Sequence, residues 1–309
     1  MGTKPPGKKW KKRSKIVTAT DPILKNPLPT DIIIPIMGPT GSGKSILVNV
    51  LAGREAVAVG NDLDSCTVNL CPVIIEPEDW MIPMVDRMPR RLVLVDTPGF
   101  DDTYVDDSEI LRRISVWLAA SYNDSMKIAG VIFLNEISRV SIRGTGRRNI
   151  DVFKKLCGAD MMKYVALCTT MWEGVPLDLA EKRKYQLRET YWKDMITGGA
   201  QVVRIYRGCS SAWGAVNTIL SEFNNSRIMC IQKELVDLQK LLPDTKAARS
   251  LQGSLNRELE QQRQWMKHLV ESVGENERQK QREEIQRTLD QIVTLNMSLC
   301  CRIRNFFTV

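Results

Sequence analysis

The sequence predicts an α/β domain with a mostly parallel sheet in three layers, followed by an α-helical, coiled-coil-like appendage. From residue 30 to about 222, short apolar runs alternate with amphipathic stretches, which is typical of parallel strands covered by helices on both faces. Beyond about residue 222 the strand signals stop, and apolar residues recur at helical spacing among Glu, Gln, Arg and Lys. We therefore expect a tail over 1–28, the α/β domain over 29–222 and the appendage over 223–309.

The expected tail is strongly basic. It holds seven positive charges and no acidic residue before position 16, at Lys4, Lys8, Lys9, Lys11, Lys12, Arg13 and Lys15. Since the net charge of the whole chain is +8, the rest of the chain is nearly neutral, and a nucleic-acid-binding surface across the protein is not predicted. For the tail the alternatives are a solvated disordered segment, a nuclear-import-type address or nucleic-acid contact, and attraction to an anionic membrane surface.

Apolar runs and amphipathic stretches place the individual elements of the α/β domain. Buried strands are expected over 31–37, 67–75, 91–95, 128–134, 164–168 and 202–206. Helices are expected over 44–51, 108–121, 147–156 and 178–195, with a last helix from about residue 212. No apolar run reaches the roughly 18 residues that a membrane-spanning helix needs.

The appendage carries two apolar stripes at helical spacing. They consist of Leu251, Leu255, Leu259, Met266, Leu269 and Val273 in the first stripe and Ile285, Leu289, Ile292, Leu295 and Leu299 in the second. We expect Pro243 to end one helix and residues 274–276 to form a turn between two more, as in a hairpin or coiled coil. The stripes leave two alternatives open, because they can pack on the chain's own α/β domain or bind a protein partner.

A glycine-rich loop lies between the first expected strand and the first expected helix. Its residues are Gly38, Pro39, Thr40, Gly41, Ser42, Gly43, Lys44 and Ser45, in the pattern G-x-x-x-x-G-K-S, and Ile46 follows in the helix. Such a P-loop turns backbone N–H groups toward phosphate oxygens at a helix N-terminus, so these nine residues are the predicted nucleotide-binding set. We expect Lys44 to act as a catalytic residue at the β- and γ-phosphates and the Ser45 hydroxyl to coordinate Mg2+.

A carboxylate stands where a P-loop domain needs one on the metal side. The expected strand over 91–95 is followed by Asp96, and then by Thr97, Pro98 and Gly99. Asp96 is expected to hold Mg2+, usually through water. The N–H of Gly99, which we assign as a catalytic residue, is expected to meet the γ-phosphate, so that this loop senses whether the phosphate is present.

A threonine between these two motifs is the third predicted metal-side residue. Thr67 ends the run L-D-S-C-T over 63–67. A threonine in a mobile segment at this point can complete the Mg2+ shell and touch the γ-phosphate, which gives Thr67 a catalytic and a metal-binding role. Ser65 is the alternative, and an ordinary loop or strand-start threonine is the simpler interpretation of Thr67.

Two later segments are expected to select the base. The strand over 164–168 leads into T-T-M-W-E, where Thr170 and Glu173 take the first and last positions of an N/T-K-x-D pattern. A carboxylate can accept both N–H groups that guanine offers, so Glu173 favours guanine, unless it only opens an exposed turn. After the strand over 202–206, Ser211 and Ala212 are expected to present a backbone N–H to guanine O6. The predicted ligands are therefore GTP or GDP with Mg2+.

Five motifs in this order match the translation-factor-related class of P-loop GTPases, which implies the three-layer P-loop NTPase fold of a Ras-like G domain. The details resemble fungal G domain-containing proteins, which are similar to the immune-associated nucleotide-binding (GIMAP), septin and chloroplast-import-receptor GTPases. The resemblance covers about residues 30–222 and rests on the runs at 38–45, 49–53, 65–67, 96–100 and 169–172. It implies a GTP-dependent switch or assembly GTPase whose G domains pair as a homodimer across the nucleotide.

Two residues depart from the pattern of this group. Glu173 stands where the fungal relatives usually carry aspartate, which weakens the guanine preference. Phe100 comes directly after Gly99, where many active GTPases place a water-orienting glutamine, and a phenylalanine side chain cannot hydrogen-bond to water. We therefore expect slow hydrolysis unless dimerisation or a partner supplies the catalytic group. The candidate cations are Arg139, Arg143, Arg147 and Arg148, although arginines near a turn are more often a solvated surface.

Other classes of function remain as alternatives. A P-loop ATPase or small-molecule kinase is disfavoured because no second Lys- and Arg-rich lid follows the P-loop at suitable spacing. A non-hydrolysing scaffold, with nucleotide as a structural ligand, is kept open by Phe100. The single histidine, His268, argues against a zinc site or a histidine-based triad. Eight scattered cysteines without C-x-x-C spacing indicate a reducing compartment, so we expect a cytoplasmic protein, with peripheral membrane association through the tail as an option.

Overall fold

The computed structural model describes ten ranges of the chain. They are residues 27–28, 30–59, 69–77, 90–102, 105–123, 126–139, 144–206, 208–222, 228–268 and 275–297. Residues 1–26 of the predicted basic tail, Thr67, and the stripe residues Leu269, Val273 and Leu299 lie outside these ranges.

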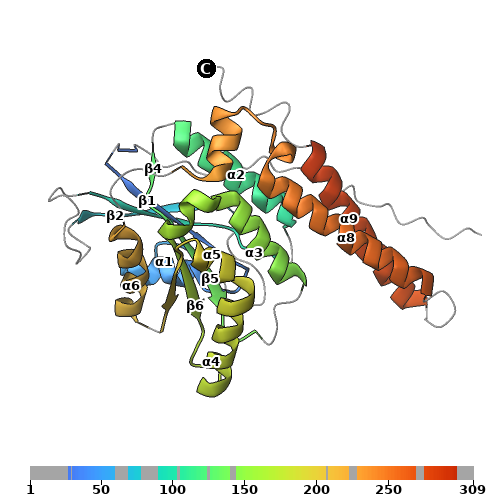
Figure 1. The fold of residues 1–309 in the computed structure, drawn as a ribbon, viewed down its shortest axis with the longest axis horizontal. Coiled ribbons are helices and arrows are strands. Elements are labelled where there is room, and N and C mark those ends of the chain that lie inside the picture. Colours follow the sequence, from blue (N-terminus) through green and yellow to red (C-terminus); the bar gives the residue numbers. More distant parts are fainter. Residues whose placement is uncertain are drawn as a thin grey trace, which may run out of the picture.

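A seven-stranded sheet forms the centre of the described residues (Figure 1). Its strands are β1 (Ile32–Met37), β2 (Cys71–Ile75), β3 (Leu92–Asp96), β4 (Lys127–Ile128), β5 (Val131–Glu136), β6 (Val165–Thr170) and β7 (Gln201–Arg204). The order is β2-β3-β1-β5-β6-β7, and the short β4 pairs with the start of β1. Every pairing is parallel except that of β2 with β3. The predicted mostly parallel α/β sheet is confirmed.

Strand β1 is apolar on both faces because helices cover the sheet from both sides. Ile32, Ile34 and Ile36 belong to the hydrophobic core on one face. Ile33 and Met37 belong to the core on the other. All five side chains are at most 1% exposed. Burying a side chain of this size stabilises the fold by roughly 1.5–3 kcal/mol, so a continuous apolar run is what a strand between two helical layers requires.

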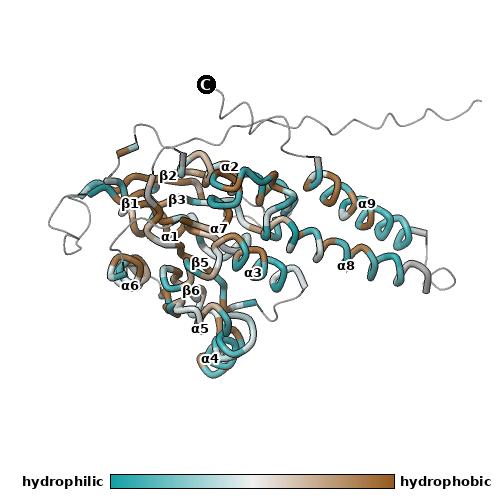
Figure 2. Tube along the Cα trace, turned by 45° about the horizontal axis from the view of Figure 1, so that its top comes forward, coloured by the Kyte–Doolittle hydropathy of each residue, from teal (hydrophilic) through white to brown (hydrophobic). Residues whose placement is uncertain are grey.

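The helices form the two outer layers. Helices α1 (Lys44–Ala52) and α6 (Cys209–Leu220) cover one face of the sheet. Helices α2 (Asp107–Asn123) and α3 (Gly144–Cys157) cover the other face, as Figure 1 shows. In Figure 2 the strands are mostly hydrophobic, while α3 and α4 mix hydrophilic and hydrophobic residues along their length. This three-layer arrangement is the one that the sequence pattern predicts.

The single helix predicted over 178–195 is wrong, because the segment is interrupted. It forms α4 (Leu177–Gln186), the π-helical turn η4 (Leu187–Tyr191) and α5 (Lys193–Thr197). Leu187 and Trp192 are both buried although they are five positions apart, a spacing that does not fit one face of an α-helix. The wider turn, closed by the Trp192 N–H donating to the Leu187 carbonyl at 2.8 Å, brings both side chains to the core.

The single strand predicted over 128–134 is also two strands. β4 and β5 are separated by Ala129 and Gly130, and the Ala129 N–H donates to the Ile33 carbonyl at 2.9 Å. β4 pairs with β1 near its start, whereas β5 pairs with the end of β1. Because residues 128–134 are all buried, across the break as well as in the strands, the apolar run gives no sign of the break.

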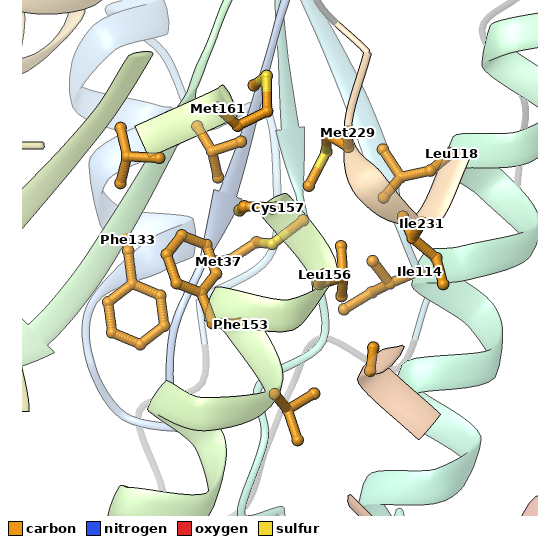
Figure 3. Packing of buried hydrophobic residues seen from close by; sticks show 14 of the residues in the cluster. Met37, Ile114, Leu118, Phe133, Phe153, Leu156, Cys157, Met161, Met229 and Ile231 are labelled. Carbon is orange, nitrogen blue, oxygen red and sulfur yellow. The ribbon is translucent and has the colours of Figure 1, made fainter. Parts of the chain in front are cut away.

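The chain after α6 returns to the sheet and joins the core between α2 and α3. It forms α7 (Cys230–Gln232), the π turn η5 (Lys233–Asp237) and the 3-10 turn η6 (Leu242–Asp244), which holds Pro243. Figure 3 shows Met229 and Ile231 near Leu118 and Ile114 of α2 and Leu156 of α3, in one hydrophobic core. Leu235 and Leu242 belong to the same core. Division of the chain at residue 222 stays a prediction, and these residues pack with the α/β domain.

The last two described helices are α8 (Lys246–His268) and α9 (Glu275–Met297), which lie side by side and reach away from the sheet (Figures 1 and 2). Gln252 donates a hydrogen bond to Asn296 at 3.3 Å, so the start of α8 pairs with the end of α9. Leu251 and Leu255 of the first stripe are at most 1% exposed and lie in the domain core. This part of the stripe therefore packs on the chain's own domain. No described helix is long and apolar enough to cross a membrane.

Candidate nucleotide-binding site

The P-loop lies at the carboxyl end of β1, the edge at which the other predicted motifs also end. The order of the sheet changes direction at β1, because β3 lies on one side of it and β5 on the other. In open parallel sheets a ligand binds at such a switch point. Gly38 has φ 145°, and a Cβ there would lie 2.4 Å from the Leu134 carbonyl oxygen. Only glycine lets the loop turn this closely against β5.

Lys44 is the first residue of α1 and is almost fully buried beneath the loop. Its Nζ donates hydrogen bonds to the Gly38 carbonyl at 3.2 Å and the Pro39 carbonyl at 2.8 Å. Burial lowers the pKa of Lys44 from its usual 10.5 to about 8, although Asp96 and Asp102 oppose this shift. A buried cation at the N-terminus of a helix, beneath a glycine-rich loop, is suited to bind phosphate oxygens.

Ser45 and Asp96 meet as the sequence predicts. The Ser45 Oγ–H donates to Asp96 Oδ2 at 2.7 Å, although 51 residues separate the two positions in the chain. Asp96 is the last residue of β3 and is fully buried. A hydroxyl and a carboxylate oxygen are hard donors that fit Mg2+, which is commonly held by one or two carboxylates plus substrate phosphates. Among the described residues no three His, Cys, Asp or Glu side chains form a metal cluster elsewhere.

The loop after β3 lies directly against the P-loop. A Cβ on Gly99 would lie 2.5 Å from both the backbone nitrogen and Oγ1 of Thr40, so this contact requires glycine. The Thr40 N–H donates to the Phe100 carbonyl at 2.9 Å, and Pro39 forms an isolated bridge with Phe100. The loop after β3, which is predicted to sense the γ-phosphate, is therefore in direct contact with the P-loop.

Thr170, the last residue of β6, contacts the P-loop from the other side. Its hydroxyl donates to the Ser42 carbonyl at 3.0 Å across 128 residues of sequence. The next residue, Met171, has φ 60°, a left-handed conformation that turns the chain sharply at the end of the strand. The predicted start of the base-selecting motif is thus held to the phosphate loop.

The other predicted base-contact residues lie at the same edge of the sheet. Glu173 is exposed in the turn after Met171. Ser211 lies in the first turn of α6, accepts a hydrogen bond from the Tyr206 N–H at 3.1 Å and donates to the Tyr206 carbonyl at 3.0 Å. Ala212 is buried beside it. The first N–H groups of α6 have no partner within the helix, so they are available as donors.

Two residues that the sequence did not assign, Asp102 and Asn49, also lie near the site, together with Arg139, one of the candidate cations. Asp102 accepts a hydrogen bond from the Thr40 hydroxyl at 3.4 Å. Arg139 donates to the Thr40 carbonyl at 2.9 Å and lies close enough to Asp101 for an ion pair at 3.4 Å. Asn49 accepts hydrogen bonds from the N–H groups of residues 56 and 57 at 2.9 Å and so ties the chain after α1 to that helix. Ile46, predicted to bind nucleotide, is 48% exposed on α1.

The four arginines proposed as surface cations have different environments. Arg148 is buried and bonded to Asp107 at 2.8 Å and to Glu258 at 2.6 Å, so it is a structural residue. Arg147 is exposed on α3, and Arg139 lies at the P-loop. Arg143, like Thr67, lies outside the described residues.

Residues 33–142 match the family model described as 50S ribosome-binding GTPase. The chain contains a GTPase G domain. The matched range takes in the P-loop, Asp96 and Gly99 and ends before the base-selecting motif at Thr170. Together with the sheet order and the site geometry, it makes the protein a GTP-binding P-loop GTPase with guanine nucleotide and Mg2+ as its ligands.

The chain also resembles solved GTPase structures at low identity. Toc33 from Arabidopsis thaliana in complex with Mg2+ and GMPPNP is 16% identical at a TM-score of 0.48, over 65% of this chain and 88% of that one. An Era variant from Aquifex aeolicus bound to GDP and AlF4- is 14% identical at 0.41, over 63% and 58%. Translation elongation factor SelB from Methanococcus maripaludis is 12% identical at 0.39, over 64% and 35%. No curated protein matches the chain significantly.

Proposed function

We propose that this GTPase is a GTP-dependent switch or assembly protein that hydrolyses GTP slowly alone and faster when two G domains pair. The observation that carries the proposal is the contact between the P-loop and the loop after β3, through Thr40, Gly99 and Phe100. A γ-phosphate on the P-loop would lie where these two loops meet. Binding or loss of that phosphate would therefore act directly on the loop that leads into α2.

The roles of the phosphate-side residues follow from their contacts. Lys44 would bind the β- and γ-phosphates, and the P-loop N–H groups would surround them. Ser45 and Asp96, with Thr67 as the predicted third residue, would hold Mg2+, which supplies charge neutralisation to the phosphates when bound. Gly99 would offer its N–H to the γ-phosphate.

Guanine selection is assigned to Thr170, Glu173, Ser211 and Ala212. Support comes from the bond between Thr170 and Ser42, which fixes the base-selecting segment at the P-loop edge. Equilibrium binding of fluorescent GTP and ATP analogues tests the assignment. GTP is expected to bind far better than ATP, and Glu173→Ala is expected to erase most of the difference, whereas Glu189→Ala on the exposed η4 turn should not. Equal affinities of the unaltered protein for both nucleotides would contradict the guanine assignment.

Pairing of G domains is supported by the character of the residue after Gly99. Phe100 is 1% exposed and lies in the core, so this position contributes no group that can orient water. Arg139 is 42% exposed in its side chain and already contacts the P-loop carbonyl of Thr40. An exposed cation at this point can reach the nucleotide of its own or a second copy, where an arginine stabilises the transition-state charge.

The turnover per molecule, measured over two decades of protein concentration, tests the pairing. We expect the turnover per molecule to rise with concentration. Arg139→Ala should flatten this rise, whereas the control Arg147→Ala, on the exposed face of α3, should leave the rise unchanged. A rate that is independent of concentration would argue against pairing.

Phe100 also favours a second candidate, a scaffold that binds GTP without hydrolysing it. Copurified GTP that survives for hours at every concentration would support that candidate.

The finer relationships are proposals as well. We infer that the chain groups with the fungal G domain-containing, GIMAP and septin-like GTPases, on the strength of its motif sequence. A reducing, cytoplasmic location is supported by Cys157 and Cys168, which are buried free thiols. Peripheral membrane contact through the basic tail and a protein partner for the distal part of α8 and α9 remain open proposals, which vesicle flotation and pull-down of the intact chain would test.

A further inference from the structure

The loop after Gly99 offers three successive side chains to the site, and each points to a different environment. Phe100 is in the core. Asp101 has φ 63°, and its carboxylate faces outward to Arg139 at 3.4 Å and Thr145 at 3.5 Å. Asp102 turns toward the P-loop. The side chain that lies closest to the expected γ-phosphate position is therefore not the one immediately after Gly99 but the third.

Asp102 is held in place from two sides. Its Oδ2 accepts a hydrogen bond from the Thr40 hydroxyl at 3.4 Å. Its Oδ1 accepts one from the Val105 N–H at 3.1 Å. Thr40 is itself fixed, because its N–H donates to the Phe100 carbonyl and its hydroxyl is also 3.3 Å from the Gly99 carbonyl. These contacts position the carboxylate beside the P-loop.

The charge of Asp102 acts at the phosphate position. It raises the pKa of Lys44, against the larger effect of burial, so the carboxylate lies within electrostatic reach of the ammonium. Asp102 contacts Thr40 of the P-loop, the same residue that Gly99 approaches most closely, so its carboxylate lies where the P-loop meets the loop expected to bind the γ-phosphate. A water molecule that attacks the γ-phosphate is expected on this side. A carboxylate at that point repels the negatively charged phosphate, whereas it can accept a hydrogen bond from the neutral attacking water.

We propose that Asp102 is the catalytic residue that orients and deprotonates the attacking water, in place of a glutamine after Gly99. This inference rests on the proposed hydrolysis of GTP. The water oxygen forms a bond to Pγ while the bond from Pγ to the β,γ-bridging oxygen breaks, and the electron pair leaves on GDP. The proton passes from the water to the Asp102 carboxylate and then to the released phosphate, so Asp102 ends unchanged. Thr40 is the positioning residue that keeps the carboxylate aimed.

Substitution by asparagine separates this role from a purely structural one. Asp102→Asn keeps Oδ1 as an acceptor for the Val105 N–H and keeps a polar group near Thr40, but it removes the charge and the basicity. We expect the kcat for GTP hydrolysis to fall by ~100-fold or more, with GTP-analogue affinity unchanged or tighter. The matched control is Asp106→Asn, which removes a charge from the same loop and should stay within about threefold of the unaltered protein.

A further readout belongs to a base and not to a loop cap. In Asp102→Ala, added formate should restore part of the rate, because a small carboxylate can occupy the vacated position. All measurements use the full chain, at a protein concentration where the rate per molecule has reached its plateau.

The outcomes distinguish this inference from the proposed function. Absence of GTP hydrolysis by the unaltered protein at every concentration would overturn the hydrolytic function, and the role of Asp102 with it. Normal hydrolysis by the unaltered protein, with Asp102→Asn within threefold of it or formate without effect on Asp102→Ala, would overturn the role of Asp102 alone. If Asp102→Asn and Asp102→Ala lose GTP-analogue binding as strongly as they lose kcat, the role of Asp102 is also overturned, because the residue would then act on loop structure.

Discussion

Lys44 is a buried cation, and its charge is more favourable when phosphate is bound than in the nucleotide-free protein. Burial lowers its pKa from 10.5 to about 8, which corresponds to as much as about 3 kcal/mol of cost to the folded state while the lysine is charged. The folded pKa lies below the unfolded one, so between pH 8 and 10.5 the unfolded chain binds more protons and stability rises with pH. The charged lysine therefore destabilises the nucleotide-free protein, and this cost is offset when it binds phosphate.

Lys44→Met is therefore expected to raise the free energy of unfolding of the nucleotide-free protein by up to about 3 kcal/mol at pH 7, while it abolishes phosphate binding. Its advantage over the unaltered protein should shrink as the pH rises from 8 toward 10.5. Urea unfolding at several pH values measures both effects. An advantage that does not change with pH would show that methionine packing, and not the lysine charge, is responsible.

The same pKa predicts how nucleotide affinity depends on pH. Phosphate oxygens favour the charged lysine, so the pKa of Lys44 must be higher in the complex than the value of about 8 without it. Above pH 8, binding then takes up a proton, and GDP affinity should fall by up to about tenfold per pH unit. Calorimetry in buffers of different ionisation enthalpy counts the proton. Affinity that is constant from about pH 7 to 9.5 would contradict the shift.

Gly99 is the residue at which the two loops touch. In Gly99→Ala the new Cβ would lie 2.5 Å from the Thr40 nitrogen, which must move and lose its bond to the Phe100 carbonyl. We expect a loss of about 1–3 kcal/mol in stability and a reduced preference for GTP analogues over GDP. Calorimetric titration with both nucleotides checks the preference, with Gly174→Ala as the control, since a Cβ there meets no atom within 4 Å.

The sequence predicts the phosphate side of the site well because its motifs are local. The P-loop and Asp96 each follow a recognisable strand, and the parallel sheet brings the strand ends together. Asp102 is not predicted, and Arg139 is predicted only as one of four candidate cations, without its contact to the P-loop. Their positions depend on Phe100 turning into the core and on β5 lying beside β1, and neither fact is visible in the spacing of residues along the chain.

At the scale of elements, Arg148 joins three helices that are far apart in sequence. From α3 it contacts Asp107 at the start of α2 and Glu258 on α8. Asp107 in turn accepts the Asp101 N–H at 2.8 Å, so the network reaches the loop after Gly99. Charged residues on helices usually indicate a solvated surface, so the sequence does not predict these contacts. It does not predict the π turn η4 either. The apolar face of each helix, in contrast, is predicted from its periodicity.

Removal of Arg148 should be costly because it leaves Asp107 buried without its cation. We expect Arg148→Met to lose about 3–5 kcal/mol, against at most about 1 kcal/mol for Glu258→Gln, whose side chain is 38% exposed. Burial already raises the pKa of Asp107 although Arg148 opposes it, and loss of Arg148 would raise it further. A raised carboxyl pKa costs stability as the pH rises, so the defect should be larger at about pH 7.5 than at about pH 4.5. Unfolding by urea at both values measures it.

At the scale of the whole molecule, the hydrophobic core of the α/β domain includes residues beyond the point where the strand pattern stops. Met229, Ile231, Leu235 and Leu242 are buried with α2 and α3, and so are the apolar residues in the first two turns of α8, Ala247, Ala248 and Leu251. The distal part of α8 and α9 makes few such contacts, and Trp265 is 43% exposed there. Helical periodicity predicts both regions as one appendage because it measures amphipathicity and not which surface the apolar face meets.

Two truncations should therefore behave differently. A chain that ends at residue 222 exposes the apolar faces of α2 and α3, each large buried side chain lost costing about 2–5 kcal/mol, and it should aggregate or fail to bind GTP. Replacing residues 262–286 by a short glycine–serine loop keeps Leu251, Leu255 and the pairing of Gln252 with Asn296, so it should melt close to the full chain and bind GTP with unchanged affinity. Thermal unfolding and GTP-analogue titration decide between these outcomes, and a soluble, fully active chain of 222 residues would mean that the segment after α6 adds nothing to the stability of the G domain.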